Sequence, residues 1–229
     1  MPNRTPPPPR EDHRTRVLLI DDHAILRQGL AQLIDQEPDL VVCGQAEEAP
    51  KGFELAETLK PDVAVVDVSL KGGNGIELIK NLKASHPNLP ILVLSMHDEN
   101  IYAERALRAG GMGYIMKEEA AESVLAGIRK VLRGEIVLSE KMQARMLSQL
   151  INGHSKKGAS PIDTLSDREL EVFRRIGEGR GTRQIAEELH LSVRTVEAYR
   201  EYIKEKLGLK NATELTQAAF HWVHEDARH

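Results

Sequence analysis

The first apolar run of the chain reads Val17-Leu18-Leu19-Ile20 and ends directly in Asp21-Asp22. Four later runs have a similar length and apolar character, at residues 40–43, 63–66, 91–94 and 113–115. Apolar runs that are continuous rather than alternating are typical of strands covered on both faces, as in a parallel sheet. The runs therefore predict five buried strands.

Stretches with helical spacing separate these strands, at residues 24–36, 47–59, 76–84, 100–109 and 118–132. In the last stretch, Val124, Ile128 and Leu132 recur at intervals of four, which places them on one side of a helix. Five strands that alternate with five helices predict right-handed crossovers and a doubly wound α/β domain with a five-stranded parallel sheet. In such folds, sites gather at the carboxyl ends of the strands.

The remainder of the chain has a different character. We expect four segments: a disordered Pro-rich tail at 1–15, the α/β domain at 16–133, a linker with a helix at 134–161, and a small all-α domain at 162–229. Four helices are predicted in the last segment, at 166–178, 182–190, 192–207 and 211–224. Ser166 and Glu169 have the spacing of a capping box, and Gly208 stands where a glycine ends a helix.

The bulk composition excludes several classes of protein. The chain is 41% hydrophobic and 29% charged, as in an ordinary globular protein, and its net charge of −4 means that any contact with DNA must come from a local arrangement. Its one cysteine, Cys43, permits neither an intrachain disulfide nor a cysteine-only metal site. No stretch approaches the roughly 20 apolar residues of a membrane span, so we expect a cytoplasmic protein that makes no membrane contact.

Three carboxylates are predicted to meet at one edge of the sheet. Asp21 and Asp22 follow the first strand, Asp67 follows the third, and these strand ends lie side by side in a doubly wound sheet. Like charges so close together repel unless a cation or a proton intervenes. We expect no His or Cys ligand beside them, and oxygen-only donors favour Mg²⁺. One carboxylate can then attack phosphorus and form an acyl phosphate.

Two further strand ends supply matching groups. Ser95 ends the fourth strand, where its hydroxyl can bond a phosphoryl oxygen, and Lys117 follows the fifth, where its charge can pair with Asp67 or its phosphate. Tyr114 lies three residues before Lys117 and can change rotamer when Ser95 moves. Any one of these features alone is a weak signal, but five of them, with the Asp21-Asp22 pair counted as one, at the ends of four strands are hard to explain by chance.

These segments resemble the receiver domain of two-component response regulators. The resemblance covers residues 16–133 and rests on the stretches 17–23, 65–70, 91–95 and 113–117. It implies that Asp67 is the phosphoacceptor for a sensor histidine kinase, and that Mg²⁺ is held by Asp22, Asp67 and the Ser69 carbonyl, with Asp21 acting through water. It also implies that Ser95 and Tyr114 are the switch pair and that Lys117 is the lysine of the family's site.

One loop departs from the family pattern. Many receivers have Met-Pro after the phosphoacceptor strand, whereas this chain reads Ser69-Leu70-Lys71-Gly72-Gly73-Asn74-Gly75. The extra glycines predict a mobile loop, which can alter the lifetime of the phosphate.

The C-terminal helices predict a helix-turn-helix, whose second helix begins at Ser192 and can enter a major groove. We expect an inner stripe of residues on this helix and an outward face with DNA-contacting residues around it. The inner stripe is Val193, Val196, Tyr199, Ile203 and Leu207. The candidate DNA-contacting residues are Ser192, Arg194, Thr195, Glu197, Ala198, Arg200, Glu201, Lys204 and Lys206, of which Arg200, Lys204 and Lys206 are candidates for phosphate contacts.

Charge alone does not identify this domain as a DNA binder, because acidic side chains outnumber basic ones from Pro161 to His229. A helical bundle that binds protein fits the charge equally well. The stretches 164–172, 184–189, 191–197 and 203–208, however, resemble the LuxR-type helix-turn-helix domain. Together with the receiver they give a resemblance to NarL/FixJ-type response regulators. It implies that the third helix reads double-stranded DNA and that the fourth pairs with a second subunit.

Two residues of the reading helix differ from the family pattern. Family members often have Lys at the position of Glu197 and His at that of Tyr199. Because a Glu can accept a hydrogen bond from a cytosine amino group, an altered base preference is one outcome, and weakened DNA binding is the other. Glu201 on the same face adds a second negative charge.

The functional hypothesis is a phosphorylation-dependent transcription regulator that is a homodimer when active. Phosphoryl on Asp67 is expected to draw in Ser95 and Lys117, and Tyr114 to turn inward, which changes domain docking or dimer formation. Two alternatives stay open: an orphan regulator that binds DNA without phosphate, and a phosphohydrolase with an Asp nucleophile. The hydrolase signal, a second acid two residues after the nucleophile, is absent because Ser69 stands there, so we expect no enzyme beyond the receiver's own phosphoryl transfer and dephosphorylation.

Overall fold

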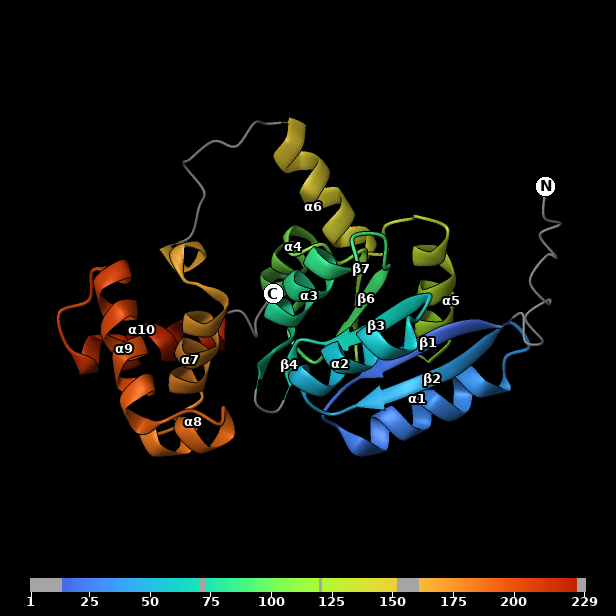
Figure 1. Ribbon diagram of the computed structural model, residues 1–229. Coiled ribbons are helices and arrows are strands. Elements are labelled where there is room, and N and C mark those ends of the chain that lie inside the picture. The colour runs from blue at the N-terminus through green and yellow to red at the C-terminus, as the bar shows by residue number, and fades with distance from the viewer. Residues whose placement is uncertain (1–13, 71–72, 120, 152–160, 226–229) are drawn as a thin grey trace, which may run out of the picture.

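Five strands form one parallel sheet in the order β2-β1-β3-β6-β7, as the computed structural model shows (Figure 1). Their bounds are β1 Thr15–Ile20, β2 Leu40–Ala46, β3 Val63–Asp67, β6 Ile91–Ser95 and β7 Gly113–Met116. The structure describes residues 14–70, 73–119, 121–151 and 161–225. The predicted sheet is confirmed, and β2 runs three residues further than predicted.

Helices cover both faces of the sheet. They are α1 Ala24–Gln36, α2 Ala49–Leu59, α3 Gly75–Ser85, α4 Glu99–Arg108 and α5 Ala121–Leu132. Because successive side chains of a strand point to opposite faces, Val17 and Leu19 of β1 pack on the side of α1 and α5. Leu18 and Ile20 pack on the side of α2, α3 and α4. This two-sided burial explains why the strands are continuous apolar runs.

Two short strands after Asp67 were not predicted. β4 Ser69–Leu70 and β5 Gly73–Asn74 pair antiparallel, with Ser69 opposite Asn74. The backbone N–H of Gly75 then donates to Val68 O at 2.8 Å, and α3 begins at Gly75. The loop predicted to be mobile is therefore hydrogen-bonded at both ends in the part that the structure describes.

The C-terminal part of the chain is helical. It contains α6 Glu140–Ile151, the 3₁₀ turn η1 Pro161–Thr164, α7 Asp167–Gly177, α8 Thr182–Glu188, α9 Val193–Leu207 and α10 Ala212–Glu225. The capping box of Ser166 and Glu169 at the start of α7 is present, and Gly208 ends α9 with φ 67°. The turn η1 was not predicted. The proposed tail and the glycine-rich part of the linker lie largely outside the described residues.

No helix among the described residues is both long enough and apolar enough to span a bilayer. Cys43, the single cysteine, is half-buried on β2, and burial raises the pKa of its thiol.

Candidate phosphorylation pocket and nucleic-acid interface

Neighbouring strands bring the predicted acids together. β1 pairs with β3 in register Ile20↔Val66, so Asp21 directly after β1 and Asp67 at the end of β3 lie at one edge of the sheet. Asp67 is 1% exposed and Asp21 is also buried, while Asp22 is half-buried. Ligand atoms of these three acids and of His23 lie within 4.8 Å of one another.

His23 corrects the expectation that no His or Cys ligand lies beside the acids. Its Nδ1 is 2.7 Å from Asp22 Oδ1 and 3.7 Å from Asp67 Oδ2. The residue directly follows the acid pair, so its position in the sequence was the available signal. His23 is solvent-exposed and adds a nitrogen to the cluster.

Lys117 lies against two of the acids. Its Nζ is 2.7 Å from Asp67 Oδ2 and 2.7 Å from Asp21 Oδ2, and its side chain is 5% exposed. β7 carries it there, because the Lys117 N–H donates to Ser95 O at the end of β6. Burial raises the pKa of Asp67 to about 7; the charge of Lys117 opposes this rise and that of Asp21 adds to it.

The donor atoms of the cluster fit a divalent cation. Asp21 Oδ2 and Asp22 Oδ1 are buried, and no hydrogen bond of the described residues satisfies either oxygen. The nitrogens of Lys117 and His23 are near them but do not meet them with hydrogen-bond geometry. Buried carboxylate oxygens without a hydrogen bond are costly, and a cation bound by oxygen ligands removes that cost.

The segment after Asp67 is held close to its carboxylate. The Ser69 N–H donates to Asp67 Oδ1 at 3.1 Å, and Asn74 Oδ1 accepts from Ile76 N at 2.8 Å to cap α3. A Cβ on Gly75 would lie 1.9 Å from Asp67 O. Glycine is therefore required at 75 because the backbone passes directly over the end of β3.

The expected switch pair is connected through His97, which the sequence analysis did not single out. Ser95 Oγ accepts from the His97 N–H at 3.1 Å, and the Tyr114 hydroxyl donates to His97 O at 2.7 Å. Tyr114 is 2% exposed and burial raises the pKa of its hydroxyl. The ring already has the inward position expected of the phosphorylated form, so an inward rotation is not available as a step from this conformation.

The candidate DNA-reading face of α9 is exposed. Ser192 caps the helix by accepting from Thr195 N at 3.0 Å, and the hydroxyls of these two residues are 2.7 Å apart. Of the residues predicted to face outward, Thr195 is half-buried, and the exposed ones are Arg194, Glu197, Ala198 and Glu201. Val196 and Ile203 are buried, but Val193 is 41% exposed, so its assignment to the inner stripe was wrong. Val193 is the first residue of the helix and lies beyond the edge of the core.

The basic residues of α9 differ in what they contact. Lys206 Nζ lies 2.6 Å from Glu169 Oε2, and Lys204 Nζ lies 2.9 Å from Glu201 Oε2. Arg200 is half-buried, and desolvation lowers its pKa. Arg194 is the exposed cation at the beginning of the helix.

A five-stranded parallel sheet with buried acids at its edge, followed by a helix-turn-helix, defines a receiver joined to a DNA-binding output domain. Family models agree: residues 17–129 match the response regulator receiver domain and residues 163–219 match the bacterial regulatory proteins of the luxR family. The chain belongs to the response regulators with a LuxR-type output domain.

Individual relatives align along most of the chain. The oxygen regulatory protein NreC of Staphylococcus aureus is 34% identical over 208 residues, which is 89% of this chain and 96% of the relative. A second relative is RcsB from Salmonella enterica serovar Typhimurium, whose structure is bound to promoter P1flhDC in the presence of the phosphomimetic BeF3⁻. Its sequence is 27% identical, and the match covers 90% of this chain and 98% of that chain with a TM-score of 0.61. A LuxR-family response regulator from Aurantimonas is 28% identical with a TM-score of 0.56, covering 60% of this chain and 99% of that one.

Proposed function

We propose that this chain is a transcription regulator whose binding to double-stranded DNA is controlled by phosphorylation of Asp67. The observation that carries the proposal is the placement of Asp67: it is buried beside two further acids and in contact with the Lys117 amine. Family membership and the DNA-bound structure of RcsB support the same function.

The chemistry proposed is transfer from a phosphohistidine of a sensor kinase. An Asp67 carboxylate oxygen attacks phosphorus, the phosphorus–nitrogen bond breaks with its electron pair going to the kinase histidine, and an acyl phosphate remains. The Lys117 amine, 2.7 Å from Asp67 Oδ2, neutralises the charge that gathers on the carboxylate and the phosphoryl oxygens. The later attack of water on this acyl phosphate is the only other reaction proposed for the receiver.

Mg²⁺ is the cofactor that the pocket fits. Asp21, Asp22, Asp67 and the Ser69 carbonyl would hold it, and when bound it supplies positive charge against the phosphoryl oxygens. The unsatisfied oxygens of Asp21 and Asp22 support this assignment. Ser95 would then hydrogen-bond the phosphoryl group, and its partner His97 would follow the change.

For the output, Arg194 and the exposed face of α9 are proposed to enter the major groove, with Ser192 and Thr195 near the phosphates. Glu197, Ala198 and Glu201 face the same side, and Arg200, Lys204 and Lys206 remain candidates for backbone contacts. The exposed side of α10 is proposed to pair with a second copy, so that two reading helices bind paired half-sites.

Phosphoryl labelling tests the first half of this proposal. Asp67→Asn should abolish labelling by radioactive acetyl phosphate in the presence of Mg²⁺. Asp62→Asn is the matched control, because Asp62 directly precedes β3 whereas Asp67 ends it. Labelling that persists in Asp67→Asn, with the control unchanged, would show that another residue accepts the phosphoryl group.

A selection of random DNA duplexes, with and without beryllofluoride and Mg²⁺, tests the second half. Enrichment of one paired sequence that strengthens with beryllofluoride is expected. Equal enrichment under both conditions would support an orphan regulator, and the absence of enrichment in both would exclude DNA binding as the output.

A further inference from the structure

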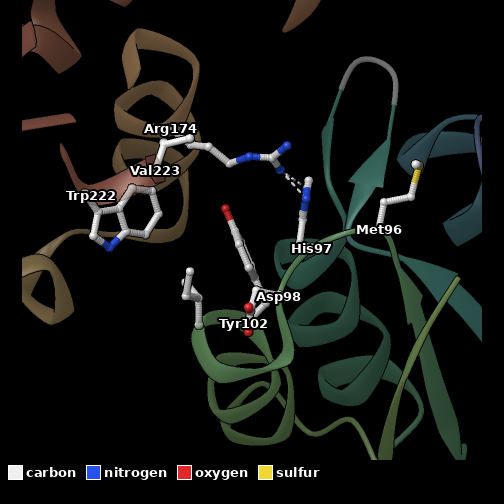
Figure 2. A pocket seen from close by; sticks show the side chains of 8 residues that line it. Met96, His97, Asp98, Tyr102, Arg174, Trp222 and Val223 are labelled. Carbon is white, nitrogen blue, oxygen red and sulfur yellow. Dashed lines mark hydrogen bonds between the residues drawn. The ribbon is translucent and has the colours of Figure 1, made fainter. Parts of the chain in front are cut away.

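Helix α7 of the output domain contacts the segment that follows Asp67. Glu171 and Arg174, one turn apart on α7, both contact receiver residues. Glu171 Oε2 accepts from Asn74 Nδ2 at 3.3 Å, and the Arg174 guanidinium donates to the His97 ring (Figure 2). His97 Nε2 in turn lies 2.5 Å from Ser69 Oγ. Since Ser69 and Asn74 are paired across β4 and β5, both ends of this hairpin are joined to α7.

The Arg174 guanidinium contacts both ring nitrogens of His97, and Nε2 also lies against Ser69 Oγ. Arg174 can only donate, so the ring nitrogen that pairs with it must accept. The ring is therefore neutral. Burial, and then the charge of Arg174, lower the pKa of His97 to about 3, which agrees with this assignment. One imidazole thus bridges the phosphorylation segment and the output domain.

His97 is also bonded to both residues of the switch pair. Its N–H donates to Ser95 Oγ, and its carbonyl accepts from the Tyr114 hydroxyl. Tyr114 is already buried, so a displacement of Ser95 toward a phosphoryl group on Asp67 would be passed to His97 rather than taken up by the tyrosine. Such a displacement would change the ring position on which the contact with Arg174 depends.

The contact between the domains does not cover the reading face. Arg194, Glu197 and Glu201 on α9 are exposed, and α7 lies between α9 and the receiver (Figure 1). What lies at the contact instead is one side of α10: Trp222 and Val223 line a cavity of about 210 Å³ together with Tyr102 and Arg174 (Figure 2). Domain contact therefore restrains α7 and α10 rather than hiding the residues expected to read DNA.

We propose that His97 and Asn74 connect the phosphorylation pocket to α7, through Arg174 and Glu171, so that occupancy of the pocket and contact with the output domain oppose one another. His97 acts as a positioning residue in this account. The inference rests on the proposed function and adds to it the residues that carry the signal between the two domains. By reciprocity, breaking these links must also change how strongly the pocket binds a phosphoryl mimic.

Trp222 provides a probe without any label, because it is the chain's single tryptophan and lies beside Arg174 at the contact. The full-length chain with Mg²⁺ is titrated with beryllofluoride while Trp222 emission and the heat of binding are recorded. In the parent chain, binding heat should be accompanied by a shift of Trp222 emission to longer wavelength, since separation of the domains exposes the indole to water.

Variants on the α7 side test the links without altering the pocket. Arg174→Gln and Glu171→Ala should each show unliganded emission already shifted toward the liganded value. Each should bind beryllofluoride about threefold to tenfold more tightly than the parent chain, because the contact opposing binding is weakened. Glu178→Gln is the matched control: it removes a partner of Arg174 that lies 2.7 Å away within the output domain, and it should behave as the parent does.

The possible outcomes separate the inference from the function on which it rests. Absence of binding heat in the parent chain would count against phosphorylation at this pocket. Binding heat without any change in Trp222 emission would overturn the link while leaving the function intact. Arg174→Gln and Glu171→Ala with the parent's affinity and the parent's emission would overturn it as well. Circular dichroism of each variant confirms that it is folded.

Discussion

At the scale of single residues, the pocket is dominated by charge that the protein alone only partly neutralises. Three acids and one amine share a buried site, and two carboxylate oxygens have no hydrogen bond among the described residues. Like charges buried so close together lower the folding stability of the receiver when no cation is bound. The amine of Lys117 is the main compensation.

Replacing Lys117 by Met should therefore lower the free energy of unfolding by about 3 kcal/mol in EDTA, because removal of one partner leaves buried charges uncompensated. Mg²⁺ should restore more stability to this variant than to the parent, since ion and amine neutralise the same oxygens. Urea denaturation followed by circular dichroism measures both. Lys51→Met is the control: its exposed pair with Glu54 should contribute less than about 0.5 kcal/mol. A Lys117→Met variant as stable as the control would contradict the account.

A second residue, Gly75, fixes the backbone of the site. Gly75→Ala should destabilise the chain by about 3 kcal/mol and abolish beryllofluoride binding, because the added Cβ would lie 1.9 Å from Asp67 O. This backbone atom cannot move aside without displacing the Asp67 carboxylate. Gly29→Ala gives the matched comparison: no atom lies within 4 Å of its added Cβ, and a helical alanine should gain about 0.5–1 kcal/mol. Unimpaired beryllofluoride binding by Gly75→Ala would disprove the close approach.

The residues that line the pocket could be predicted from the sequence. The residues that connect the pocket to the output domain could not. Asp67 and Lys117 follow apolar runs, and strand order alone brings strand ends together. His97 follows Ser95 by two residues, and nothing in its sequence position indicates that its ring contacts Arg174, 77 residues away. Contacts between domains depend on how two surfaces meet, which local periodicity does not encode.

At the scale of elements, helix termini were predicted best where the sequence carries a capping side chain or a terminating glycine. The start of α7 is fixed by Ser166 and Glu169, and the end of α9 by Gly208, because each residue satisfies backbone groups that the helix leaves open. The β4–β5 hairpin was missed for the opposite reason. Its glycines carry no side-chain pattern, and its pairing depends on Gly75 passing over β3, a tertiary contact.

The cap of α7 leads to a pH-dependent prediction. Burial by itself raises the pKa of Glu169, but hydrogen bonds from Lys206 and Ser166 outweigh it and hold the pKa below its ordinary value of 4.5. A carboxyl whose pKa is lower in the folded state stabilises the fold above its unfolded pKa and loses that contribution as the pH falls through the folded pKa. Glu169 should therefore contribute fully at neutral pH and little in acid.

Glu169→Gln should lower the stability of the output domain by about 1–2 kcal/mol at neutral pH and flatten its decline between about pH 6 and pH 3. Urea unfolding monitored by Trp222 reports on this domain selectively, because the tryptophan packs on Phe173 of α7 at a ring distance of 5.6 Å. Glu187→Gln, on an exposed position of α8, is the control and should leave the pH profile unchanged. Parallel acid profiles for Glu169→Gln and the parent would rule out this role.

At the scale of the whole molecule, the two domains meet over several elements. Arg105 of α4 donates to Leu165 O at 2.8 Å and to Asp167 Oδ1 at 3.0 Å, and Lys80 of α3 contacts Asp167 Oδ2 at 2.8 Å. The contact leaves the reading face of α9 and the outer side of α10 exposed. Under the proposed function, a single copy in this conformation can therefore present α9 to DNA, and the pairing of two copies is the step that we expect to be controlled.

Phe220 allows that step to be tested, because it is 51% exposed on α10 and stacks on His224 rather than entering the core. Phe220→Glu should leave the fold intact but raise the dissociation constant for DNA with paired half-sites by about tenfold or more, since the second recognition unit no longer binds as part of one complex. Affinity for a single half-site should not change. Ile136→Glu serves as the control, because it places the same charge on a residue that is 62% exposed and lies outside the output domain, between α5 and α6. Fluorescence anisotropy with both duplexes measures DNA binding, and sedimentation of the beryllofluoride-bound chain measures the pairing of two copies. If Phe220→Glu binds the paired half-sites as tightly as Ile136→Glu does, the dimer contact lies on another surface.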